Sequence, residues 1–100
     1  TMIEQFVKQL LKEKGLPPNL EPKVYDQLVK DLSERAVDLI NRRQIDAMTD
    51  EQAKQFDDLL AAHPEDVQAA QEFIQKNVPN QDQVVAAALG EFRQLYLGNT

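Results

Sequence analysis

The chain offers few side chains that could perform covalent chemistry. It contains one serine, one histidine and no cysteine. Nucleophilic catalysis requires an activated nucleophile, a base beside it and donors for the developing oxyanion. Ser33 lies in the middle of a long helical pattern, and His63 lies 30 residues further along. We therefore interpret Ser33 as a helix-surface hydroxyl and predict no catalytic residue.

His63 could in principle act as a base or a metal ligand, because Glu65 and Asp66 follow it closely. Transition-metal sites are usually built from several His or Cys side chains, which this sequence lacks. His63 directly precedes Pro64, a typical position for the end of a helix. We interpret it as a residue that helps to cap the preceding helix, and we predict no metal site and no cofactor.

Two groups of carboxylates leave an alternative open. Asp46 lies near Asp50 and Glu51, and Asp57 is followed by Asp58. Such groups can hold a divalent cation or supply a general acid and base. The sequence lacks the glycine and closing glutamate of a calcium-binding loop, and solvated helix surfaces also explain these residues. A carboxylate-based enzyme or a divalent-cation-binding ligand protein is thus the alternative function.

The composition excludes several classes of function. The net charge is −6 and the pI is about 4.6. Binding to a phosphate backbone depends on clustered Lys and Arg, so we expect no nucleic-acid partner. No apolar run approaches the roughly 20 residues that span a bilayer, so we expect no membrane partner. The lack of cysteine rules out a disulfide framework and favours a cytoplasmic location.

Apolar residues at helical spacing predict five helices separated by Gly and Pro signals. The predicted ranges are residues 3–14, 22–47, 50–62, 64–76 and 80–97. No segment alternates apolar and polar residues as a strand does, so we expect almost no sheet. The predicted fold class is all-α, a compact bundle of about five helices around the long second helix, with a radius of gyration of about 13 Å.

One helical domain should cover residues 1–100, with Thr1 set aside as a residue added ahead of Met2. The apolar stripes that we expect to face the core include Val24, Leu60 and Val67.

The last predicted helix carries the best hint of a binding surface. Gly90 lies inside it, where glycine costs about 1 kcal/mol relative to alanine. A close helix crossing within the monomer is the leading explanation, and a docked partner helix is the alternative. Leu95, Tyr96 and Leu97 give the end of this helix more apolar surface than one stripe requires. Gly90, Leu95, Tyr96 and Leu97 are therefore the candidate binding residues.

The arrangement of caps and core positions also resembles a known family. The residues that carry the resemblance span nearly the whole chain: Leu10-Leu11 to Gly15-Leu16, Met48 to Gln52 with Phe56 and Leu59-Leu60, Phe73-Ile74 to Asn77-Val78-Pro79-Asn80, and Phe92 with Tyr96-Leu97. They are similar to a family of short, all-helical bacterial domains of unknown function, common in candidate-phylum bacteria. The resemblance implies a free-standing helical domain in the bacterial cytoplasm and assigns no activity and no site residue.

We therefore expect a small helical module that binds a protein partner, or a second copy of itself as a homodimer, through a helix face. Most notable residues are accounted for as core or cap, whereas the residue types that catalysis needs are scarce.

Overall fold

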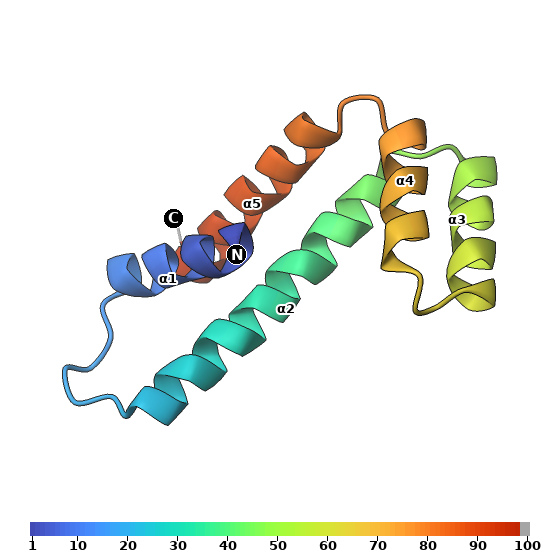
Figure 1. Ribbon diagram of the computed structural model, residues 1–100. Helices are drawn as coiled ribbons and strands as arrows, with labels where there is room; N and C mark the ends of the chain where they lie inside the picture. The colour runs from blue at the N-terminus through green and yellow to red at the C-terminus, as the bar shows by residue number, and fades with distance from the viewer. Residues whose placement is uncertain (99–100) are drawn as a thin grey trace.

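The computed structural model describes residues 1–98, which form five α-helices and no strand (Figure 1). The helices are α1 (Met2–Lys14), α2 (Pro22–Asp46), α3 (Asp50–Ala62), α4 (Val67–Asn77) and α5 (Gln81–Leu97). The predicted all-helical bundle around a long second helix is confirmed. None of the helices within residues 1–98 is both long and apolar enough to cross a membrane.

Side-chain caps explain where two of the helices begin. The Thr49 hydroxyl accepts from the backbone N–H of Gln52, and the Gln52 side chain accepts from the N–H of Thr49. Thr1 makes the same reciprocal arrangement with Glu4 at the start of α1. The Thr1 hydroxyl thereby satisfies a backbone N–H that would otherwise lack a partner.

The fourth helix starts three residues later than predicted. Pro64 suits a first helical turn, but α4 begins at Val67. The Asp66 carboxylate accepts from the backbone N–H of Ala69 at 3.0 Å and so caps the helix. The chain before it turns, with the Asp66 N–H donating to the His63 carbonyl at 3.1 Å. The start of α4 is therefore set by the Asp66 cap and not by Pro64, which lies three residues before the helix.

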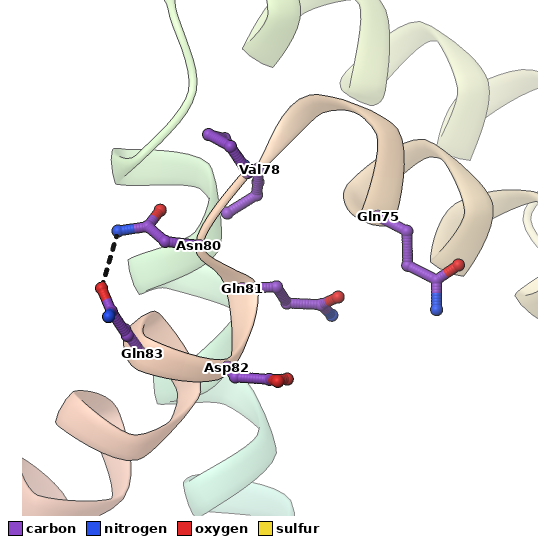
Figure 2. Close-up of a pocket in the computed structure, with 7 residues that line it drawn as sticks. Gln75, Val78, Asn80, Gln81, Asp82 and Gln83 are labelled. Atoms are coloured by element: carbon purple, nitrogen blue, oxygen red, sulfur yellow. Dashed lines mark hydrogen bonds between the residues drawn. The ribbon is translucent and has the colours of Figure 1, made fainter.

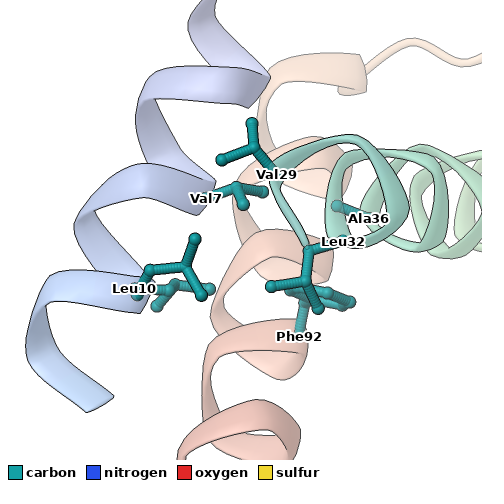
Figure 3. Close-up of a cluster of buried hydrophobic side chains, with 7 residues drawn as sticks. Val7, Leu10, Val29, Leu32, Ala36 and Phe92 are labelled. Carbon is teal, nitrogen blue, oxygen red and sulfur yellow. The ribbon is translucent and has the colours of Figure 1, made fainter. Parts of the chain in front are cut away.

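The main core lies where α1 and α5 pack against α2 (Figure 3). The rings of Phe6 and Phe92 lie 6.5 Å apart at its edge. Its buried side chains come from the apolar stripes of three helices: Val7, Leu10, Leu11, Val29, Leu32, Ala36 and Phe92. This cluster positions α5, the helix that carries the candidate binding residues.

A second and smaller cluster, the hairpin core, lies at the other end of α2. There α3 and α4 form an antiparallel helical hairpin, and the Phe56 and Phe73 rings lie 5.5 Å apart. Its buried members are Met48, Phe56, Ile74 and Val78. Because the two clusters follow one another along α2, the molecule measures 49 × 31 × 17 Å. Its radius of gyration is 15.8 Å, larger than the expected 13 Å.

Three side chains expected to face the core are exposed instead. Val24 is 45% exposed, Leu60 38% and Val67 65%. Val24 lies in the first turn of α2, and the other two lie near the turn that joins α3 to α4. Helical periodicity shows which face of a helix each residue lies on. It does not show whether a neighbouring helix is long enough to cover that face as far as its ends.

Truncating Leu10 to alanine should lower the free energy of unfolding by about 2–5 kcal/mol, because its side chain is fully buried and the core cannot collapse completely around the cavity. The matched control, Leu95→Ala, removes a side chain that is 71% exposed and should change stability by no more than about 0.5 kcal/mol. Urea unfolding followed by circular dichroism measures both. Equal effects would contradict the assigned core.

Candidate functional site

The structure does not bring Ser33 and His63 into a catalytic arrangement. Ser33 lies in the middle of α2 beside a hollow that α1 also lines, whereas His63 lies exposed at the end of α3. The His63 backbone N–H donates to the Leu59 carbonyl at 2.9 Å, so this residue does cap the helix, as predicted. Ser33 differs from the expected solvated hydroxyl: its Oγ is covered and has no hydrogen-bond partner within residues 1–98.

The carboxylates of the alternative function lie at the end of α2, in the first turn of α3 and further along α3. Asp46 ends α2 and pairs with Arg43 at 2.9 Å, which occupies one of its oxygens. Asp50 and Glu51 lie in the first turn of α3, where the positive end of the helix dipole stabilises their negative charges. Asp57 lies exposed about two turns after Asp50. In the part of the chain that the structure describes, no three acidic or histidine side chains are placed to hold a metal ion.

An open hollow of about 420 Å³ lies at the turn between α4 and α5 (Figure 2). Gln75 at the end of α4 and Gln81, Asp82 and Gln83 at the start of α5 line it, and Asn80 donates to the Gln83 side-chain oxygen at 3.5 Å. Asp82 is the one charged residue in this lining, and no histidine, lysine or second carboxylate lines the hollow with it. The lining therefore contains no pair of titratable groups that could serve as a general acid and base.

Gly90 does not mark a close helix crossing, so the leading explanation for it was wrong. A Cβ atom built on Gly90 would meet no atom within 4 Å, and the residue is exposed. Ala86 and Ala87, one turn before it, are exposed as well. The surface of α5 around Gly90 is therefore open to the surroundings.

The other three candidate residues divide between the surface and the main core. Leu95 is 71% exposed. Tyr96 and Leu97 are half-buried and pack against the main core, and the Lys14 ammonium lies 5.6 Å from the centre of the Tyr96 ring. At 100° per residue, Leu95 points about 140° away from Gly90 around the helix axis. The structure therefore places Leu95 and Gly90 on different faces.

Two bidentate ion pairs hold α5 in position, and the sequence reading missed both. Arg43 of α2 donates to both oxygens of Glu91 at 2.9 Å, and Arg93 donates to both oxygens of Glu13 in α1. Hydrogen bonds from the arginines hold the pKa values of Glu91 and Glu13 below the ordinary value of 4.5. The partners are 48 and 80 residues apart, so no local pattern reveals them.

Gly90→Ala should raise the free energy of unfolding by about 0.5–1 kcal/mol, because the position is helical, exposed and free of close neighbours. Urea unfolding of the two proteins measures the difference. Destabilisation by the added methyl group would contradict the open surroundings of Gly90.

The Arg43–Glu91 pair should stabilise the fold in a pH-dependent way. A carboxyl whose pKa is lower in the folded state contributes stability above its ordinary pKa and loses it as the pH falls through the folded value. Arg43→Met should therefore lower the urea midpoint near pH 7, and the difference from wild type should shrink as the pH falls below 4.5. Arg42→Met, which breaks a pair within one helix, should have a smaller effect. A deficit that is independent of pH would contradict the prediction.

Comparison with known proteins places the chain in a family. Residues 10–96 match the profile described as "Protein of unknown function (DUF5663)". The matched segment begins within α1 and ends at Tyr96, so it includes parts or all of the five helices. No curated protein and no solved structure matches the chain. The expected relationship to a family of short domains of unknown function is confirmed: the chain belongs to the DUF5663 family.

Proposed function

We propose that this protein is a small helical interaction module that binds another protein, or a second copy of itself, through exposed helix surface. The observation that carries the proposal is the exposure of Leu95 on α5, where 71% of the residue is accessible. At 100° per residue, Tyr96 and Leu97 point about 100° and 160° away from it around the helix axis, so Leu95 projects from a face of its own. A large apolar side chain on an ordered helix is a residue that a partner protein can bury.

The surroundings of Leu95 favour a rigid binding surface. The two bidentate Arg–Glu pairs and the main core fix α5 against α1 and α2. A surface that is already ordered loses little conformational entropy when a partner docks. Leu95 would then act as an apolar anchor on a preformed helix end.

The proposal includes a cytoplasmic location, which the lack of cysteine favours, in a bacterium, as the family resemblance implies. The alternative, a carboxylate-based enzyme or a divalent-cation-binding protein, has no observation in its favour, because Asp46 is paired with Arg43 and no group of three acidic or histidine side chains in the described residues could hold a metal ion. Nucleic acid and membrane are not among the proposed partners, since the chain is acidic.

Leu95→Lys should weaken binding to a captured partner by about tenfold or more, because it places a charge in the apolar contact. The measurement is quantitative affinity capture of proteins from a bacterial lysate by the tagged wild type, followed by titration of the captured protein. Val37→Lys is the matched control, since Val37 is 42% exposed on α2 and should leave binding unchanged. Failure to capture any protein specifically, with no self-association either, would contradict the proposed function.

A further inference from the structure

A groove of about 660 Å³ lies between α1 and the beginning of α2, and we call it the α1–α2 groove. Leu16 and Tyr25 provide its accessible apolar surface, with the fully buried Leu11 beneath it, and Lys8 and Lys12 lie along it. The remaining lining residues carry no charge, so the groove contains no carboxylate. Its volume lies in the range of sites that bind ligands or side chains of a partner.

The two lysines of the groove are not held in ion pairs in the described part of the chain, although Lys8 lies near enough to Glu4 to lower the pKa of that carboxyl. Within residues 1–98, neither Lys8 nor Lys12 forms an ion pair or a side-chain hydrogen bond. Lys8 also borders a neighbouring hollow that Glu4, Asp26 and Glu34 line. An apolar floor with two unpaired ammonium groups fits an occupant that is both apolar and acidic.

The helical hairpin of the same protein carries that chemistry. Residues 49–77 contain seven carboxylates and two lysines, a net charge of −5 out of the −6 of the whole chain. At its turn, Leu60 and Val67 are exposed, and Asp57 and Glu65 lie three and two residues from them. We call these four residues the hairpin tip. Neither Asp57 nor Glu65 forms an ion pair with another described residue.

The two surfaces lie at opposite ends of the molecule. Tyr25 of the groove is near the start of α2, and the hairpin follows its last residue, Asp46 (Figure 1). At 1.5 Å per residue, these positions are about 32 Å apart along the helix. One copy therefore cannot place its own hairpin tip in its own groove, whereas two copies can meet in this way.

We propose that the acidic hairpin tip of one copy docks into the lysine-containing α1–α2 groove of a second copy. This inference goes beyond the proposed function, because it names a second copy as the partner and two surfaces that do not include Leu95. Leu60 and Val67 would lie against Leu16 and Tyr25, while Asp57 and Glu65 lie near the two lysines. Different surfaces of the two copies meet, so the contact is head-to-tail and can add further copies.

The first measurement is sedimentation velocity of the wild type over a wide range of protein concentration. Near about 0.1 M salt, charges act over about 10 Å, and near about 1 M salt they are screened within about 3 Å. The proposal predicts concentration-dependent association at the lower salt, with a dissociation constant about tenfold higher at the upper salt. A protein that stays monomeric at all concentrations overturns the proposal.

Charge reversal on each surface provides the second measurement. The groove variant carries Lys8→Glu and Lys12→Glu, and the tip variant carries Asp57→Lys and Glu65→Lys. Each should raise the dissociation constant for self-association by about tenfold or more. The matched control carries Asp31→Lys and Asp38→Lys, which change the net charge by the same amount as the tip variant. Both positions are exposed on α2 and lie outside the groove and the tip. The control should associate at least as well as the wild type. Circular dichroism verifies that all variants fold.

Mixing the groove variant with the tip variant should restore association, because the mixture pairs an unaltered tip with an unaltered groove and a reversed tip with a reversed groove. Symmetric association through any single surface does not predict this rescue. Association that ignores both variants, or a mixture that fails to associate, overturns the proposal. If the protein is monomeric yet still captures another protein in a Leu95-dependent way, self-docking fails while the proposed function stands.

Discussion

The length of α2 is the constraint on which the rest of the structure depends. Its 25 residues extend about 37 Å, whereas α1 has 13 residues and α5 has 17. The two shorter helices cover much of its apolar stripe and enclose the main core with it. At its far end, α3 and α4 fold into a hairpin and enclose a second cluster around Phe56 and Ile74. The protein is elongated because its two cores share one long helix instead of merging.

The same arrangement separates the charges of the protein. The bidentate pairs of Arg43 with Glu91 and Arg93 with Glu13 lie between the helices of the main core, where they help to fix α5. The hairpin has few basic residues and retains a net charge of −5. Lys8 and Lys12 lie on α1, far from the hairpin. An elongated shape thus keeps opposite charges apart that a spherical bundle of the same composition could bring together.

The candidate site was only partly predictable. The sequence identified Leu95 as surplus apolar surface, and this residue is exposed. The sequence analysis grouped Leu95 with Gly90, although the two residues lie on different faces of the helix. It also explained Gly90 by a close helix crossing, but a Cβ atom added to Gly90 would meet no atom within 4 Å. The α1–α2 groove escaped the sequence reading because its residues come from α1, a loop and α2. Nothing in their spacing shows that these segments meet.

The sequence by itself determined the helices. Helix boundaries follow from local interactions: Gly15 and Gly98 adopt positive φ after α1 and α5, and Thr49 caps α3 through its own neighbours. Only the tertiary structure decided which apolar residues are covered, since Val67 and Ile74 lie on one side of α4 yet are 65% and 8% exposed. The hydrogen bonds of a helix and of its caps join residues three or four apart in the sequence, so the local sequence pattern is enough to predict them. Burial depends on where distant helices end, and this follows from packing of the whole chain.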